Sequence, residues 1–335
     1  MRDAGRSGRA VRRGALALLL GLALQGQAQS VPVCARHAAA APALQRLGEV
    51  MTTGRFISYQ PTQIEVRDGK ATAADEAGIT ADLQVLRPRF DGLILYGVLD
   101  GADRVVDVAA RLGFRAVILG VWNIDDPREL SLALAAAARQ PQRVVGLSLG
   151  NERILAKVTT PAALAARLQQ LRARAPQLPL TTSEPFHLFE QPAALPLLQQ
   201  MDFMLANVHP IFQPWFASAS VQDGARFVVN VANDLAAAHC GAVLIKETGV
   251  PTHPPALGYT PQRQAAFWRA LQQAFAPSPR RAFAWFSAFD APWRVQDEHP
   301  TPGAQPQEGS WGLYDAQRRA KPAATALSPL PQALR

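Results

Sequence analysis

The sequence predicts an α/β fold, a (β/α)8 TIM barrel in a single domain. Eight short apolar segments alternate with longer segments of helical spacing. Segments that are apolar on both faces and alternate with helices are typical of a parallel sheet covered by helices. Eight such units in roughly 280 residues fit this barrel, whose usual size is about 250 residues. A doubly wound open sheet is the alternative, and it is disfavoured because no glycine-rich dinucleotide fingerprint follows the first strand.

The expected strands are short runs rich in β-branched and aromatic residues. They cover residues 56–60, 92–97, 116–122, 144–152, 178–185, 203–210, 242–248 and 282–290. Two of the intervening helices have clear start signals, Thr160-Pro161 and Thr260-Pro261. In each pair the threonine can cap the helix and the proline suits its first position.

The N-terminal segment has the features of a secretory signal peptide, which we place at residues 1–28. Five arginines precede an apolar run at residues 14–24, and small residues follow it. The run is short for a bilayer span, which needs roughly 20 apolar residues, so an uncleaved anchor is the less favoured alternative. We expect an exported, periplasmic or extracellular protein without stable membrane insertion after signal cleavage. The barrel domain would cover residues 29–320, and residues 321–335, with three prolines, would form a flexible tail.

Charge and cysteine content exclude several classes of function. Residues 1–28 hold five arginines and one aspartate, so their removal lowers the formal charge from +8 to +4. The remaining basic residues are scattered, which argues against a nucleic-acid partner. Cys34 and Cys240 are the two cysteines of the chain, too few for a disulfide-dense scaffold or a cysteine-rich metal site. Whether they pair is open at this point, as is the oligomeric state, and we expect neither a metal nor a cofactor.

Polar residues close the expected strands. Tyr59, Tyr96, Trp122, Asn151 with Glu152, Glu184, His209 and Glu247 each stand at or near the end of a different strand. In such a barrel the active site lies at the carboxyl ends of the strands. A strand avoids carboxylates because burying an ion costs several kcal/mol unless it is compensated. We therefore expect the carboxylates at these ends to meet at one mouth.

Two facing carboxylates are the minimum equipment for cleaving a glycosidic bond. One has to stay protonated to donate to the leaving oxygen, and the other has to stay ionised beside the anomeric carbon. We assign Glu152 as the acid and then the base, and Glu247 as the nucleophile. Spacing in the sequence alone leaves the swapped assignment open.

Six motifs in order give the chain a family resemblance. The segments GNE, TTSEPFH, NVHPIF, KETGVPT, WFSAFDAPWR and EGSWGLYD resemble those of family 17 of the glycoside hydrolases, the β-1,3-glucanases and their glucan-transferring relatives. The resemblance runs from about residue 57 to about residue 315. It implies a (β/α)8 barrel, retention of anomeric configuration, acid/base catalysis by Glu152 and nucleophilic attack by Glu247. It also implies that Asn151 holds the 2-hydroxyl of the sugar.

Further side chains near the strand ends are candidates for substrate binding. They are Tyr59, Tyr96, Asn151, Glu184, His209, Trp293 and Arg294. We expect Lys246 to point out of the barrel, Phe267 and Trp268 to pack on a helix face, and Trp311 and Tyr314 to anchor the final turn. The chain departs from the family pattern at Val250 and Ala291, where many members have an aromatic residue and a glutamate, and at Arg294, which replaces a lysine.

The expected function is retaining hydrolysis of β-1,3-glucan through a covalent glucosyl-enzyme intermediate, with a β-glucan polysaccharide or oligosaccharide as partner. A first alternative is a β-1,3-glucanosyltransferase that uses the same two glutamates and a sugar acceptor in place of water. A second alternative, from another class, is a non-catalytic glucan-binding barrel of the cell envelope.

Overall fold

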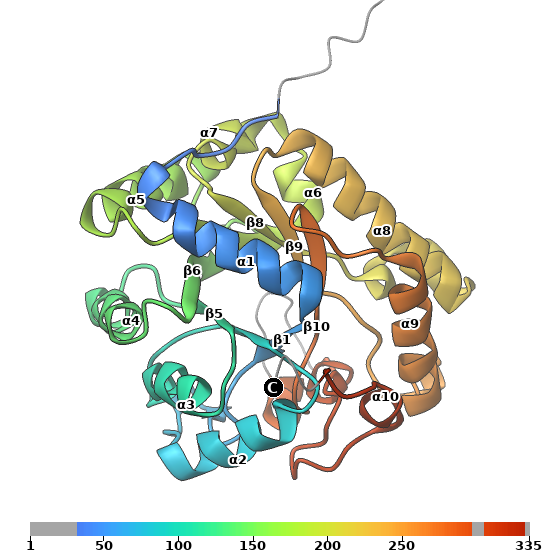
Figure 1. Ribbon diagram of the computed structural model, residues 1–335. Helices are drawn as coiled ribbons and strands as arrows, with labels where there is room; N and C mark the ends of the chain where they lie inside the picture. The colour runs from blue at the N-terminus through green and yellow to red at the C-terminus, as the bar shows by residue number, and fades with distance from the viewer. Residues whose placement is uncertain (1–31, 297–304, 332–335) are drawn as a thin grey trace, which may run out of the picture. The chain divides into compact units, whose positions relative to one another are not determined.

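Eight parallel strands close into a barrel in the computed structural model, which describes residues 32–296 and 305–331. Each strand pairs with the next one along the chain, and the last pairs with the first (Figure 1). The predicted (β/α)8 barrel is therefore confirmed, and the signal peptide lies outside the described residues. The barrel strands are β1 (Phe56–Tyr59), β4 (Gly92–Leu95), β5 (Ala116–Val121), β6 (Val144–Asn151), β7 (Leu180–Pro185), β8 (Phe203–Asn207), β9 (Ala242–Glu247) and β10 (Arg281–Trp285).

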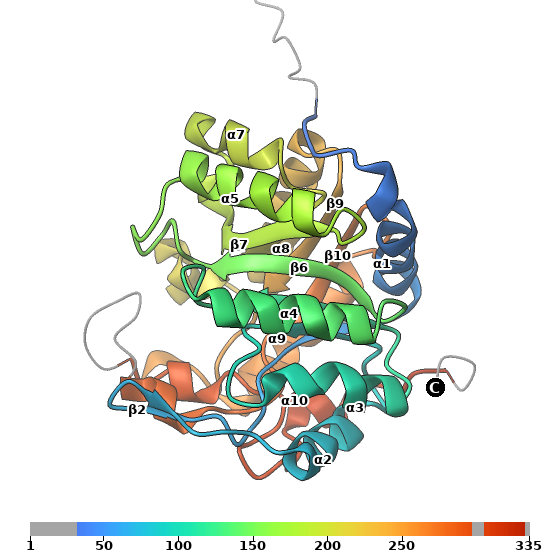
Figure 2. The same ribbon diagram turned by 90° about the vertical axis from the view of Figure 1, so that its left-hand side faces the viewer.

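Helices surround the barrel, as both ribbon views show (Figures 1 and 2). The longer ones are α1 (Ala41–Thr53), α2 (Glu76–Leu86), α3 (Val105–Arg111), α4 (Pro127–Arg139), α5 (Pro161–Arg174), α8 (Val221–Ala238) and α9 (Pro261–Ala274), and the single turns are α6 (Phe186–Phe189), α7 (Leu195–Leu198) and α10 (Pro322–Thr325). Thr160 and Thr260 cap α5 and α9 through hydrogen bonds from backbone N–H groups, as their sequence signals predict. No helix in the described part of the chain is long and apolar enough to cross a bilayer.

Helix α1 closes one end of the barrel. Its residues Leu47, Val50 and Met51 belong to the same buried cluster as Phe56 and other apolar side chains of the barrel strands. Because α1 precedes β1, this closed end is the amino-terminal end of the strands. The opposite end, where the strands finish, is left for the functional site.

A second, larger apolar layer fills the space between strands and outer helices. Phe267 and Trp268 of α9 are buried in it, which confirms their predicted packing role. Trp311 and Tyr314 are also buried, as expected for residues that anchor the final turn. Apolar area removed from water is the main favourable term in holding such layers together.

A small hairpin that we did not predict follows β1. It consists of β2 (Val66–Arg67) and β3 (Lys70–Ala71), which pair antiparallel. The intervening Asp68 and Gly69 both have positive φ, the signature of an Asp-Gly hairpin turn. Strand β2 contacts the 3-10 turn Pro292–Gln296 that follows β10, and the two lie side by side in Figure 2.

A disulfide joins Cys34 to Cys240, with 5.3 Å between their Cα atoms. It ties the segment before α1 to the start of β9, where Val33 also pairs with His239. The pairing that the sequence left open is thereby resolved. The bond lies at the amino-terminal ends of the strands, the end that α1 covers.

The C-terminal segment packs against the barrel through residue 331. Ala324, Leu327 and Leu330 are buried, and Lys321 donates a hydrogen bond to Asp290. The prediction of a flexible tail from residue 321 is therefore wrong for residues 321–331. The three prolines suggested a loose segment, but the apolar residues between them supply a packing face.

Candidate active site

A cleft of about 410 Å³ opens at the carboxyl ends of the strands. Asn151 and Glu152 enter it from the end of β6, and Glu247 enters it from the end of β9. Its other walls come from the segments after β1, β4, β5 and β10. The two glutamates that the sequence separates by almost a hundred positions thus share one cleft.

Glu247 is nearly buried and has two close polar neighbours. Its Oε1 lies 2.9 Å from Nζ of Lys246, and its Oε2 lies 3.4 Å from Nε2 of His209. Burial by itself would raise the pKa of this carboxyl. The charge of Lys246 and the contact with His209 outweigh burial and lower the pKa to about 2. Glu247 is therefore an ionised carboxylate at neutral pH.

Glu152 stands in a left-handed backbone conformation, with φ of +54°. Its N–H donates to the carbonyl of Ser183, and its Oε1 accepts a hydrogen bond of 2.8 Å from Asn207 Nδ2. A non-glycine residue in this region is strained, and such strain concentrates at functional sites. Burial raises the pKa of Glu152, and the negative charge of Glu247 raises it further.

The pKa values of the two carboxyls are consequently shifted in opposite directions, although both belong to glutamates. One is held ionised by a neighbouring cation, and the other is biased toward its neutral, proton-donating form. A pair of this kind can donate a proton on one side of a bond and offer an anion on the other, which is the requirement for glycoside cleavage.

Lys246 does not point out of the barrel, so that prediction is wrong. Its side chain is 2% exposed and lies inside, where Nζ donates to Asn151 and sits 4.2 Å from the centre of the Tyr96 ring. Neighbours on a strand alternate in direction, and Leu244, two residues earlier, also faces the barrel interior. A lysine can be buried there because a carboxylate, an amide and an aromatic face replace its lost water.

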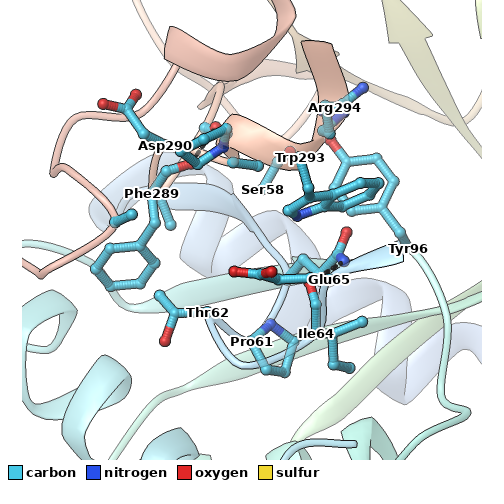
Figure 3. A pocket seen from close by; sticks show the side chains of 16 residues that line it. Ser58, Pro61, Thr62, Ile64, Glu65, Tyr96, Phe289, Asp290, Trp293 and Arg294 are labelled. Carbon is cyan, nitrogen blue, oxygen red and sulfur yellow. Dashed lines mark hydrogen bonds between the residues drawn. The ribbon is translucent and has the colours of Figure 1, made fainter. Parts of the chain in front are cut away.

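Tyr96, Asn151, Trp293 and Arg294 line the cleft, as predicted for substrate-binding residues. Figure 3 shows Trp293, Arg294 and Tyr96 grouped on one side of a smaller adjoining cavity of about 50 Å³, with Pro61 and Ile64 among its other walls. Burial, and then the charge of Glu247, raise the pKa of Tyr96 well above its usual value, so its hydroxyl stays protonated.

Two predicted binding residues have their polar atoms hydrogen-bonded to the scaffold. The side chain of Tyr59 is almost fully buried, and its hydroxyl donates to Asp82. Glu184 is fully buried, and its carboxylate accepts hydrogen bonds from the N–H groups of Ile154 and Leu155. Burial raises the pKa of Glu184 to about 7. Glu184 therefore does not line the cleft, because the scaffold binds its carboxylate. Tyr59 does line the cleft although its hydroxyl is bonded to Asp82, so its contact with sugar stays a prediction.

His209 also faces protein rather than the cleft. Its ring packs against Phe212, Phe286 and Trp311, and one ring nitrogen contacts Glu247. It can orient Glu247, which is a different role from the predicted sugar contact.

Two residues of the site had no assigned role in the sequence. Trp122, after β5, is 40% exposed and lines the cleft, and an aromatic ring in such a place suits stacking on a sugar. Its backbone N–H donates to Glu129, which also accepts from Val98 and Asn123 and so fixes two cleft loops. Trp122 could have been found from its place at a strand end, and Asn207, the partner of Glu152, from its place at the start of the NVHPIF motif.

Comparisons with known proteins agree with this geometry. Residues 57–312 match the model of the BtgE/BtgC glycoside hydrolase domain. A curated Aspergillus niger relative, named "Putative glucan endo-1,3-beta-glucosidase btgC", is 26% identical over 79% of this chain, which spans only 42% of that protein's length.

Solved structures share the fold. A Rhizomucor miehei β-1,3-glucanosyltransferase of glycoside hydrolase family 17 is 19% identical over 84% of this chain and 99% of its own, with a TM-score of 0.60. An endo-laminarinase from Formosa Hel1_33_131 is 18% identical over 81% of this chain and 85% of its own, with a TM-score of 0.64. The family resemblance of the motifs is thereby confirmed, and the chain belongs to the BtgE/BtgC glycoside hydrolase domain family.

Proposed function

We propose that the protein is a retaining glycoside hydrolase that cleaves β-1,3-glucan. The observation that carries this proposal is the pair of glutamates in one cleft, with the pKa of Glu247 lowered and that of Glu152 raised. The names of the relative and the solved neighbours, which refer to β-1,3-glucan enzymes and laminarinase, support the substrate class.

In the first step, Glu247 attacks the anomeric carbon while the bond from that carbon to the bridging oxygen breaks. Glu152 gives its proton to the leaving oxygen, and a glucosyl ester on Glu247 remains. Glu152, now ionised, then takes a proton from water, which attacks the anomeric carbon and releases Glu247. Tyr96, Trp122 and Trp293 offer flat faces to the sugar rings.

Glu247→Gln tests the assignment of the nucleophile. The variant should lose activity on β-1,3-linked oligosaccharides by at least about 10³-fold, because its amide cannot form the ester. Glu49→Gln is the matched control, since Glu49 is exposed on α1 at the closed end of the barrel. Full activity of Glu247→Gln would exclude this role. Proton NMR of the first product distinguishes retention, which gives the β-anomer, from inversion, which gives the α-anomer.

Transfer of the glucosyl unit to another sugar is a second candidate. One observation favours it: Phe212 is 58% exposed on the segment after β8, and its ring contacts His209, which in turn contacts Glu247. This exposed ring lies outside the lining of the cleft and could hold an acceptor sugar. Timed product profiles decide between the two, since only transfer yields oligosaccharides longer than the starting material.

We also propose that the protein is exported. The Cys34–Cys240 disulfide supports this, because such bonds persist in oxidising compartments and are rare in reducing ones. A polymeric glucan substrate is consistent with action outside the cytoplasm. A free-thiol assay on protein isolated under alkylating conditions tests the pairing in the cell.

A further inference from the structure

The amino group of Lys246 lies beneath the cleft with three polar neighbours, two of which accept hydrogen bonds and one of which is an ion-pair partner. It is 2.9 Å from Glu247 Oε1 and 3.3 Å from Ser183 Oγ, and it donates to Asn151 Oδ1. The ring of Tyr96 covers it at 4.2 Å. A lysine buried in this way is costly unless paired, so its position is fixed by these partners.

The contact with Lys246 determines which way the Asn151 amide points. An ammonium group can only donate hydrogen bonds, so the amide atom that faces it has to be the oxygen. The Asn151 nitrogen is then the group left for the cleft, which Asn151 lines. A ligand atom that meets this nitrogen has to be a hydrogen-bond acceptor, such as a hydroxyl oxygen.

The titratable groups that interact with Glu247 come from four elements. Lys246 belongs to β9, His209 follows β8, Tyr96 follows β4 and Glu152 follows β6. The charge of Arg294, after β10, acts on Tyr96. Among the groups that favour the ionised form of Glu247, Lys246 has the largest influence.

We propose that Lys246 is a positioning residue that keeps the Glu247 carboxylate ionised and oriented and keeps Asn151 as a hydrogen-bond donor toward the sugar. The site then selects sugars that carry an acceptor, a hydroxyl oxygen, where Asn151 meets them. The catalytic part of this inference rests on the proposed function, but the two contacts exist without it.

The first test needs no substrate. In the full chain labelled with ¹³C at the glutamate carboxyl, the Glu247 signal is identified by its loss in Glu247→Gln. Lys246→Met removes the charge and keeps the chain length, and the midpoint of the Glu247 titration should rise by about two pH units. An unchanged midpoint overturns the proposal. Lys246→Gln is measured in the same way if the methionine variant does not fold.

Lys321→Met is the matched control. The Lys321 amino group is also largely buried, and it pairs with Asp290 Oδ1 at 2.6 Å, outside the cleft lining. The control should destabilise the protein and leave the Glu247 midpoint unchanged. If Lys321→Met shifts that midpoint as far as Lys246→Met does, the effect is not specific and the proposal fails.

The second test uses turnover. Lys246→Met should lower kcat about 100-fold with a smaller change in KM. The acid limb of its pH–rate profile should shift to higher pH, because the pKa of Glu247 rises. A series of monodeoxy aryl β-glucosides tests Asn151: the wild type should discriminate against one of them, and Lys246→Met should lose at least about tenfold of that discrimination. Unchanged discrimination would refute the claim on Asn151.

The titration and the turnover measurements together distinguish failure of the proposed function from failure of the role proposed for Lys246. If the wild type cleaves no β-glucan, the proposed function fails, while the titration still decides the role of Lys246. If the wild type cleaves β-glucan and Lys246→Met titrates like it, the role of Lys246 fails alone.

Discussion

At the scale of single residues, the surroundings shift the pKa values of two glutamates in opposite directions. Glu247 has a lysine against its carboxylate and Glu152 has an asparagine, so the opposite charge of Lys246 is in direct contact with Glu247 alone of the two. The pKa of Glu247 falls to about 2 and the pKa of Glu152 rises. Activity should therefore be retained well into acidic solution and should fall as pH rises through the pKa of Glu152, where the acid loses its proton.

The coupling between the two carboxyls can be measured directly. In Glu247→Gln the pKa of Glu152 should fall, because one of the causes that raise it, the charge of Glu247, is gone. Burial, the larger cause of the rise, remains in this variant. Titration of the ¹³C carboxyl signals gives both values. A Glu152 midpoint that does not move would mean that the carboxyls do not interact, and would weaken the proposed mechanism.

At the scale of elements, strand β7 shapes the turn that carries Glu152. Glu184, on β7, accepts the N–H groups of Ile154 and Leu155, and Ser183 accepts the N–H of Glu152. These bonds hold the segment after β6 in place, including the strained backbone of Glu152. The positive φ of Gly150, +89°, belongs to the same bend.

Glu184→Gln should disturb this turn. A glutamine side chain has one acceptor oxygen, so one of the two buried N–H groups would face an NH₂ donor. We expect a loss of about 1–3 kcal/mol in the free energy of unfolding. We also expect a fall in kcat larger than the change in KM, because the acid is displaced rather than the sugar site. Urea unfolding and steady-state kinetics check both, and wild-type values in both would contradict the role given to Glu184.

At the scale of the whole molecule, the stabilising disulfide and the candidate active site lie at opposite ends of the barrel. The disulfide and helix α1 lie at the amino-terminal ends of the strands, and the cleft lies at the carboxyl ends. Changes at the closed end should therefore alter stability without altering the reaction. This division is general for the fold.

Replacing both Cys34 and Cys240 with serine tests this division. The bond links residues 206 positions apart, so its loss should lower the free energy of unfolding by about 2–5 kcal/mol. Activity at low temperature should be retained. Urea unfolding measures the first and glucan turnover the second, with reduced wild-type protein as a control for the serine side chains. Unchanged stability would mean that backbone pairing alone, such as Val33 with His239, secures this end.

Much of the fold could be predicted because its signals are local. All eight barrel strands lie within or close to the predicted ranges, since parallel strands buried on both faces are continuous apolar runs. The hairpin at Val66–Ala71 was missed because its strands are two residues long and exposed. The prediction of a flexible tail was wrong because it relied on three prolines and overlooked the apolar residues between them, such as Leu327 and Leu330, which pack against the barrel.

The sequence by itself determined the barrel, the two glutamates and the end of the strands at which they meet, because hydrophobic periodicity and strand-end position are properties of neighbouring residues. Only the tertiary structure decided which polar side chains reach the cleft. Tyr59, Glu184 and Lys246 look alike as polar residues at strand ends, yet the first two bond to the scaffold and the third lies beneath the carboxylate. Their partners are residues on other strands and helices. Because these partners offset the free-energy cost of burying a polar group and are distant in the sequence, no local pattern reveals them.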